Sequence, residues 1–389
     1  MANKGGLIGN DNLFVPDAPT IGDASTGNTQ VSVAFTAPSD VGNDDITSFA
    51  ARVTDGTNVF NGTASSSPIT VTGLSNGTSY TAQVWAINDY GNGPLSAATS
   101  SFSPVAPRGL FFGGQGPSSD TDVNVIDFIT ITSTGNAQDF GDTGQTAAFS
   151  YAVGNATRSV VATGKYNGST SNVIEFVTPT SAGNASDFGD TTVARVKAAG
   201  ASNSTRGLFM AGNSSNVIDY ITIASTGNAI DFGDTTRNAG GAGSGASPTR
   251  AILAGGAPSS NVIEYVTIAS TGNAQDFGDL AQAAESMVGC SSDTRALVGM
   301  VNGKIESITI ASLGNAVNFG ETQYENVLTS PFACSSNTRA VFAGGKRSSY
   351  FNNIEYFTIA SASNGTDFGD LTVARNRGAA IGTAHGGLA

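Results

Sequence analysis

Hydrophobic and polar residues alternate over short stretches throughout the chain, and turns rich in Gly, Asn, Pro and Asp separate these stretches. In the segment TQVSVAFTAP, Val31, Val33 and Phe35 share one face, and residues 80–86 repeat the same alternation. A period of two residues is that of a β-strand with one buried face. Roughly seven such strands fit within residues 15–103, which predicts a two-sheet β-sandwich.

From residue 107 onward, a set of signals recurs in a fixed order. An Arg opens a short apolar strand such as RGLFMAG, and a loop of variable length leads to a strand such as NVIDYITIAS. A TGNA turn, a DFGD tetrapeptide and a segment leading to the next Arg follow. Successive Phe-Gly pairs lie 48, 44, 45, 42 and 49 residues apart. A period of about 40 to 50 residues with four short strands is typical of a β-propeller blade.

The last residues, ARNRGAAIGTAHGG, match the segment that precedes each Arg. We therefore expect the C-terminal strand to complete the first blade, which leaves no open sheet edge and gives six blades. The prediction is an all-β chain with an N-terminal tether at residues 1–14, a β-sandwich at 15–103 and a six-bladed β-propeller at 104–389. The predicted blades are residues 374–384 with 108–142, then 146–190, 194–234, 237–279, 283–321 and 327–370.

The DFGD tetrapeptide occurs five times and NFGE once. Asp-Phe-Gly also holds magnesium in protein kinases, but a kinase needs one copy and a His-Arg-Asp type loop, which this chain lacks. We expect the Phe to fill the space between blades, the Gly to allow a positive φ or a close approach, and the Asp side chains to accept turn amides. The phenylalanines are Phe140, Phe188, Phe232, Phe277, Phe319 and Phe368, and the strand-opening arginines are Arg108, Arg158, Arg206, Arg250, Arg295 and Arg339.

An acidic residue follows Ile in the third strand of every predicted blade. These carboxylates could form a ring for a metal or a cationic ligand, or they could pair with the strand-opening arginines and lock the blades together. Recurrence in all six blades favours the pairing, because a single active site rarely needs six equivalent groups. Calcium at DFGD would require more oxygen ligands from one loop, so we expect no metal and no cofactor. The acids are Asp127, Glu175, Asp219, Glu264, Glu306 and Glu355.

Composition narrows the function classes. The formal charge of -13 and a pI near 4.3 would repel phosphate backbones, so we expect no nucleic-acid partner. The N-terminal segment lacks the apolar core of a signal peptide, and we expect no membrane insertion because no apolar run of about 18 residues occurs.

Catalytic residues are scarce. The single histidine, His385, is expected to be exposed near the closing strand, and Cys290 and Cys334 have no His neighbour in the sequence. We interpret both cysteines as small buried residues and predict no catalytic residue and no enzymatic activity.

Loops that differ between repeats are better candidates for binding. The loop after the strand opened by Arg reads QGPSSDTDV, KYNGSTS or KRSSYFN in three blades and only NSS in another. Loops on a rigid scaffold commonly carry binding groups, although these residues could equally have no role. The aromatic and cationic candidates for sugar stacking or protein contact are Tyr166, Lys346, Arg347, Tyr350 and Phe351.

Residues 15–103 contain the motifs PDAPTI, FTAP, GLSNGTSY and AINDYGNGPLS. With these motifs the segment resembles a fibronectin type III domain. The resemblance implies that the hydroxyl of Tyr80 ties a corner between strands. Phe35 stands where the family usually has Trp, and the integrin-binding Arg-Gly-Asp of some members is absent.

The repeats from residue 107 resemble kelch repeats, in which a strand ending in Gly-Gly precedes a strand that carries an aromatic residue. The Phe of DFGD stands where kelch blades usually have Trp. The combination with a fibronectin type III module is similar to virion proteins of tailed bacteriophages. This resemblance implies a non-enzymatic structural or adhesive component of the virion, assembled in the host cytoplasm and oligomeric in the particle.

Three functions follow as hypotheses. The first is a tail-fibre or surface component that contacts a host surface glycan or protein through propeller loops, while the N-terminal segment and the sandwich bind other virion proteins. The second is a capsid decoration or tail subunit that binds only virion proteins. The third is a carbohydrate-active enzyme on a propeller scaffold, which would need paired carboxylates in one cleft.

Overall fold

The structure is a computed structural model that describes residues 14–118, 120–299, 303–323 and 330–388. It divides into two compact units, and the boundary between them falls between Ala106 and Pro107. Most of the predicted tether at residues 1–14 lies outside the described residues. The regular elements of the described chain are β-strands, apart from one 3-10 turn, η1 (Gly386–Leu388).

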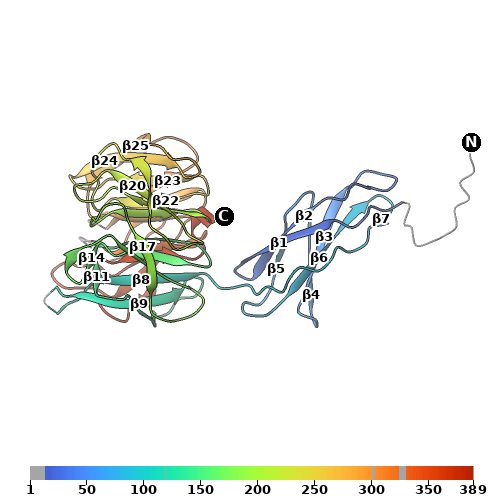
Figure 1. The fold of residues 1–389 in the computed structure, drawn as a ribbon, viewed down its shortest axis with the longest axis horizontal. Coiled ribbons are helices and arrows are strands. Elements are labelled where there is room, and N and C mark those ends of the chain that lie inside the picture. Colours follow the sequence, from blue (N-terminus) through green and yellow to red (C-terminus); the bar gives the residue numbers. More distant parts are fainter. Residues whose placement is uncertain (1–13, 119, 300–302, 324–329, 389) are drawn as a thin grey trace, which may run out of the picture. The chain divides into compact units, whose positions relative to one another are not determined.

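The first unit is a sandwich of two antiparallel sheets (Figure 1). One sheet has the order β1-β2-β5 and the other the order β4-β3-β6-β7. The strands are β1 (Thr20–Gly27), β2 (Gln30–Thr36), β3 (Ser48–Thr54), β4 (Val59–Ala64), β5 (Ile69–Thr72), β6 (Thr81–Asn88) and β7 (Gly91–Asn92).

The alternating residues of these strands form the core of the sandwich. Val31 and Val33 of β2 and Val84 of β6 are fully buried. The rings of Phe35 and Phe49 come from opposite sheets, and their centroids lie 4.6 Å apart. Strands with one buried face thus arise from the period-two pattern.

The second unit contains six antiparallel sheets of four strands each, which we number in chain order (Figure 1). Sheet 1 consists of β34 (Ala379–Gly382), β8 (Arg108–Gln115), β9 (Asp122–Thr130) and β10 (Gln138–Asp142); sheet 2 of β12 (Tyr151–Gly154), β13 (Ser159–Ala162), β16 (Val173–Val177) and β17 (Ser186–Asp190). Sheet 3 consists of β18 (Ala199–Ser202), β19 (Arg206–Met210), β20 (Val217–Thr222) and β21 (Ile230–Asp234); sheet 4 of β22 (Gly243–Ala246), β23 (Arg250–Ala254), β24 (Ser260–Thr267) and β25 (Gln275–Ala284). Sheet 5 consists of β26 (Val288–Ser291), β27 (Arg295–Gly299), β28 (Lys304–Thr309) and β29 (Val317–Glu321); sheet 6 of β30 (Phe332–Ser335), β31 (Arg339–Ala343), β32 (Asn353–Thr358) and β33 (Thr366–Asp370).

Three short strands, β11 (Ala147–Ala148), β14 (Lys165–Tyr166) and β15 (Ser169–Thr170), form a small additional sheet. The strands of the six sheets fall within the predicted repeats with one difference. Strand β25 continues to Ala284, beyond the predicted end at residue 279, because Ala284 still pairs with Ser260 of β24.

The first strands of the six sheets contact one another in cyclic order. Strand β12 contacts β18, and the same contact continues through β22, β26 and β30 to β34, which in turn contacts β12. Sheet 1 combines both ends of the unit, since the C-terminal β34 pairs with β8 at Ala379 and Phe112. Sheet 1 is therefore in contact with both sheet 6 and sheet 2.

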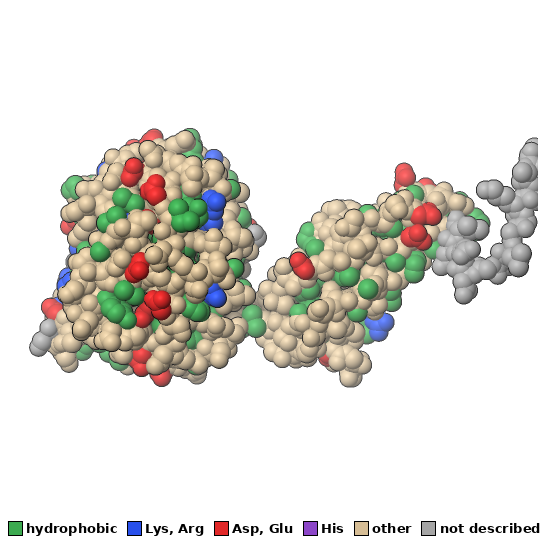
Figure 2. Space-filling view, viewed as in Figure 1, with side chains coloured by type: hydrophobic (Ala, Val, Ile, Leu, Met, Phe, Trp, Pro, Cys, Tyr) green, Lys and Arg blue, Asp and Glu red, His purple; other side chains and the backbone are tan. Residues whose placement is uncertain are grey.

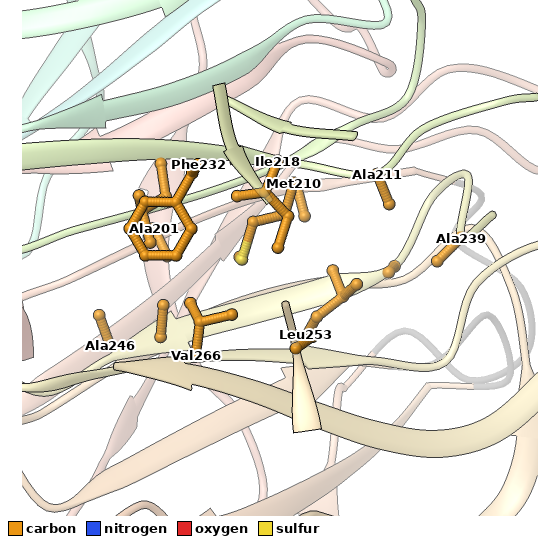
Figure 3. Close-up of a cluster of buried hydrophobic side chains, with 14 of the residues drawn as sticks. Ala201, Met210, Ala211, Ile218, Phe232, Ala239, Ala246, Leu253 and Val266 are labelled. Atoms are coloured by element: carbon orange, nitrogen blue, oxygen red, sulfur yellow. The ribbon is translucent and has the colours of Figure 1, made fainter. Parts of the chain in front are cut away.

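Each space between neighbouring sheets contains a hydrophobic cluster, and each cluster contains one phenylalanine of the repeated tetrapeptide. In the cluster between sheets 3 and 4, Phe232 lies beside Ile218 and Met210 of sheet 3 (Figure 3). Leu253 and Val266 of sheet 4 face them. The six phenylalanine side chains, Phe140, Phe188, Phe232, Phe277, Phe319 and Phe368, are at most 3% exposed.

The same tetrapeptide forms hydrogen bonds to the next sheet. Gly227 in the turn of sheet 3 donates its N–H to the carbonyl of Phe188 in sheet 2 at 2.7 Å, and Ala229 donates to the carbonyl of Asp190 at 2.8 Å. The N–H of Asp190 donates to Oδ1 of Asn228 at 3.1 Å. Corresponding Asn acceptors are Asn136, Asn184, Asn273, Asn315 and Asn364. The turn of each sheet thus covers the outermost strand of the preceding one.

The glycine of the tetrapeptide makes this contact possible. Gly189 has a φ of 146°, and a Cβ at this position would lie 2.5 Å from the carbonyl oxygen of Gly227. A side chain would push the turn away. The expectation that the Asp carboxylates accept the turn amides is wrong, because the contact uses backbone groups of the tetrapeptide and the Asn side chain of the turn.

The strand-opening arginines also join neighbouring sheets. The guanidinium of Arg206 lies 4.8 Å from the ring centroid of Tyr220, and its Nη1 donates to the carbonyl of Ile268 in sheet 4 at 3.0 Å. Arg108, Arg158, Arg250, Arg295 and Arg339 make the equivalent bond to a carbonyl of the next sheet. Each arginine therefore stacks on its own sheet and binds the following one.

The position of Phe232 gives a direct test of the inter-sheet packing. We expect Phe232→Ala to lower the free energy of unfolding by about 3 to 5 kcal/mol, because a buried ring is replaced by a cavity. Ile230→Ala is the matched control on the same strand: Ile230 is 57% exposed, so the change should be within about 0.5 kcal/mol. Denaturant unfolding measures both, and equal effects would contradict the packing role.

Candidate functional site

The six acidic residues of the third strands are buried, and each accepts a hydrogen bond from the preceding sheet. In every case the donor lies two residues after the tetrapeptide. Glu264 accepts from the N–H of Thr236 at 2.9 Å, and Glu355 accepts from the N–H of Gln323 at 3.0 Å. Asp127, Glu175, Asp219 and Glu306 accept from Thr372, Gly144, Thr192 and Ala281 respectively. These carboxylates therefore hold neighbouring sheets together.

The predicted pairing of these acids with the strand-opening arginines is wrong. In sheet 3, Arg206 pairs with Thr222 whereas Asp219 pairs with Phe209, so the two lie three residues, or roughly 10 Å, apart along the strands. The acids that do form ion pairs use another arginine, located in the segment before the first strand. Arg195 binds Asp219 at 2.8 Å, and both side chains are at most 1% exposed.

The ion pair between Arg375 and Asp127 joins the last segment of the chain to sheet 1 at 2.9 Å, and both side chains are fully buried. We expect Asp127→Asn to lower the free energy of unfolding by about 3 to 5 kcal/mol, because Arg375 would keep its charge without a carboxylate. Asp139→Asn makes the same change at the exposed neighbour that pairs with Asp127 across β9 and β10. It should have little effect in the same thermal or denaturant unfolding measurement; an equal loss would argue against the ion pair.

A cavity of about 100 Å³ lies between the first strands of all six sheets, near the residues where these strands begin. Just before the first strand of each sheet, at this end of the cavity, one residue has a left-handed backbone conformation, with φ between 49° and 68°. We call these six residues the mouth ring: Phe149, Lys197, Gly241, Ser286, Ser330 and Arg377. A non-Gly residue in this region costs of order 1 kcal/mol or more, so five strained positions at one end of the cavity are unusual.

Backbone hydrogen bonds link five of the mouth-ring residues in succession: Ser330, Arg377, Phe149, Lys197 and Gly241. The N–H of Phe149 donates to the carbonyl of Arg377 at 2.5 Å, and the N–H of Lys197 donates to the carbonyl of Phe149 at 3.1 Å. Gly241 donates to Lys197, and Arg377 donates to Ser330. These bonds fix the directions in which the side chains leave the ring.

Three cationic groups surround the ring of Phe149. The distances to its centroid are 4.9 Å from Cζ of Arg377, 5.3 Å from Nζ of Lys165 and 5.6 Å from Nζ of Lys197. Arg377 also donates from Nη1 to Oε1 of Gln115 at 2.5 Å. The whole chain has only 17 Lys and Arg residues, and charged side chains are sparse on the surface seen in Figure 2, so this convergence stands out.

The ion pairs within the described residues involve other cations, namely Arg195, Lys346 and Arg375. Two acids lie near Arg377. Asp122 accepts a hydrogen bond from Nε2 of Gln115 at 2.8 Å, and the same Gln115 accepts one from Arg377. The hydrogen bond from Lys346 lowers the pKa of Asp120, with smaller contributions from Tyr350 and from the charges of Lys346 and Arg377. Among the described residues, neither acid forms an ion pair with the three cations around Phe149.

The predicted loop residues separate into two groups. Lys346 binds Asp120 at 2.5 Å and Tyr350 donates its hydroxyl hydrogen to the same carboxylate, so these two predicted residues come together. Arg347 beside them is exposed, and Phe351 is half-buried.

Tyr166 has a different environment. Its hydroxyl donates to Oε1 of Glu175 at 2.9 Å, at the junction of sheets 1 and 2. Burial, together with this carboxylate, raises the pKa of Tyr166 to about 12. The described contacts thus assign Tyr166 to the inter-sheet bonding and not to the group around Tyr350.

Phe149, Lys197 and Arg377 are not among the site residues predicted from the sequence. The signal that could have found them is their shared position in the repeat, just before the first strand, where the six copies carry Phe, Lys, Gly, Ser, Ser and Arg. The surrounding positions are small or apolar in most copies. Variation at a single structurally equivalent position is what a common scaffold with a specialised site would show.

The first unit can be compared with a known family. Residues 17–102 match the fibronectin type III domain. No curated protein matches the chain. In this fibronectin type III domain, the hydroxyl of Tyr80 accepts the N–H of Ser75 at 3.0 Å, which is the corner bond that the resemblance implied. The six sheets from residue 107 onward lie beyond the matched residues.

The described residues contain no group of three or more His, Cys, Asp and Glu side chains that could hold a metal ion. Burial raises the pKa of the Cys290 thiol to about 12, and burial also raises that of Cys334. Among the same residues, no helix has the length and apolar character needed to cross a membrane.

The other end of the central space is closed by the C-terminal segment. His385 is 5% exposed, so the expectation of an exposed histidine is wrong. Its Nε2 lies 2.9 Å from the carbonyl of Gly154 and 3.2 Å from Oγ of Ser202, while Nδ1 accepts the N–H of Gly387 at 3.2 Å. The segment after β34 folds back between the first strands, and η1 contacts β18, β22 and β26. This contact could not be anticipated from a short terminal motif.

His385 should make stability depend on pH. Burial lowers its pKa from 6.5 to about 4, so between these values the unfolded chain binds a proton that the folded chain does not. The contribution of neutral His385 to the free energy of unfolding is therefore fully present above about pH 6.5, and it falls by up to roughly 3 kcal/mol toward pH 4. His385→Gln should remove this slope in unfolding measured across that range. Glu175 and Glu306, whose pKa values are raised by burial, are present in both proteins and cancel in the difference. An unchanged slope would contradict the assignment.

Proposed function

We propose that residues 107–389 form a six-bladed β-propeller with a kelch-like blade order and that the chain is a non-enzymatic binding protein. The cyclic contacts of the first strands and the pairing of β34 with β8 support the propeller. In such an assembly each sheet is one blade, and the C-terminal strand closes the ring without an open edge.

The mouth ring carries the proposal for binding. Five non-Gly residues adopt strained backbone there, and two of them, Lys197 and Arg377, lie with Lys165 around the ring of Phe149. Strain of this kind persists where a structure is organised for ligand contact. The loops between second and third strands lie at the same end, because the first strands lead away from the mouth ring and the antiparallel second strands return toward it.

A carbohydrate-active enzyme is less well supported. Such an enzyme would place two carboxylates in one accessible cleft. The six repeated acids are instead buried and accept hydrogen bonds from the neighbouring sheet. We therefore assign these acids to the structure of the ring.

We further propose that the protein is a virion component of a tailed bacteriophage, a tail-fibre or surface protein assembled in the host cytoplasm. The combination of the fibronectin type III domain with the repeats from residue 107 supports this hypothesis. In this arrangement the N-terminal segment and the fibronectin type III domain bind other virion proteins. The mouth-ring end contacts a host surface glycan or protein.

Binding of the full chain to an array of host-surface glycans tests the proposed face. We expect the double variant Arg347→Ala with Tyr350→Ala to reduce binding by about tenfold or more, as expected for aromatic and Arg contacts. Asp293→Ala, in the loop between the first and second strands of sheet 5 at the opposite end, should leave binding unchanged. An absence of glycan binding, or a loss caused by Asp293→Ala alone, would argue against this face.

A further inference from the structure

The charges around Phe149 suggest which kind of ligand the mouth ring would take. Lys165, Lys197 and Arg377 all lie within 5.6 Å of one ring centroid, so any two of them are separated by no more than about twice that distance. The Debye length at physiological salt is about 8 Å, so their mutual repulsion is only partly screened. An anionic group bound between them would relieve this repulsion.

We propose that the mouth ring binds the carboxylate of an acidic sugar, with Lys165, Lys197 and Arg377 as the groups that contact it. This inference rests on the proposed glycan-binding function and specifies its ligand class. A guanidinium and two ammonium groups donate charge-assisted hydrogen bonds to carboxylate oxygens.

Part of this site is ordered before any ligand arrives. Backbone bonds hold the main chain at Phe149, Lys197 and Arg377, and Gln115 accepts a hydrogen bond from the Arg377 guanidinium. The negative face of the Phe149 ring attracts the cations without neutralising them. This partial ordering lowers the entropic cost of holding a small anionic group.

The surroundings favour a sugar over an extended polyanion. The formal charge of the chain is -13, so a ligand with many negative charges would be repelled by most of the surface. The cavity of about 100 Å³ admits a small group and not a folded element. A single carboxylate on a hydroxyl-rich ring meets both conditions. An acidic peptide is the main competitor and is included in the test.

Cellobiouronic acid and cellobiose form a minimal pair for this test, because a carboxylate replaces one hydroxymethyl group. We expect calorimetric titration of the full chain to detect cellobiouronic acid and not cellobiose, with an affinity that falls as salt increases. Lys197→Gln and Arg377→Gln should each reduce the affinity by about tenfold, as expected for loss of one charge-assisted bond. Arg377→Lys should retain part of it.

Arg52→Gln is the matched control. Arg52 is an exposed cation in the fibronectin type III domain, so its loss changes the net charge equally and should leave the affinity unchanged. Thermal unfolding of each variant verifies that it is folded. A glutamate-containing peptide and sulfated lactose test whether a peptide carboxylate or a sulfate group binds in place of the sugar carboxylate.

Four results would overturn the proposal: no binding of cellobiouronic acid, equal binding of cellobiose, tighter binding of the peptide or of sulfated lactose, or folded Lys197→Gln and Arg377→Gln variants with unchanged affinity. The glycan array distinguishes failure of this carboxylate-binding proposal from failure of the proposed function. Array binding that depends on Arg347 and Tyr350 but not on Lys197 or Arg377 would leave the function in place and remove the mouth ring as its site.

Discussion

The outermost strand of every sheet in residues 107–389 has backbone groups that its own sheet does not pair, and the Gly-Asn turn of the next sheet pairs with them. The N–H of Asp190 reaches Asn228, and the carbonyl of Phe188 receives Gly227. Unpaired strand edges attract other chains, so covering them is a condition for a stable sheet protein. The rest of the unit depends on this contact because it sets the spacing between neighbouring sheets.

The contact also explains why the repeat is so uniform at its outer positions. The glycine must stay small to admit the turn, the phenylalanine fills the space beneath, and the buried acid accepts a hydrogen bond from the residue two positions beyond the tetrapeptide. Each of these groups is satisfied only by a neighbouring sheet. Because these contacts lie at the outer strands, the residues just before the first strands can differ between sheets. The mouth ring consists of such residues.

Acidic and basic side chains occupy different parts of this unit. Acids with structural roles are buried and hydrogen-bonded, whereas three of the few cations gather at one end of the central cavity. The aromatic ring of Phe149 attracts these cations through its negative face. The opposite end is closed by the segment that contains His385, so an incoming ligand would meet the cavity from the mouth ring.

The sequence by itself determined the all-β class, the strands and the repeated positions. Alternation with period two follows from the geometry of a single strand, and the spacing of 42 to 49 residues follows from the length of one four-stranded unit. The match of residues 17–102 to the fibronectin type III domain agrees with motifs that are readable in the sequence. Tyr80 is an example, since its partner Ser75 is only five residues away.

Tertiary structure alone decided the partners of the buried acids, the burial of His385 and the group around Phe149. Arg375 reaches Asp127 and Arg377 reaches Phe149 across more than 200 residues of sequence, because the C-terminal strand β34 pairs with β8 of sheet 1. Sequence periodicity specifies which face of a strand is buried, but it carries no information about which distant segment covers that face. The candidate site arises from such distant contacts, so it became visible only in the folded chain.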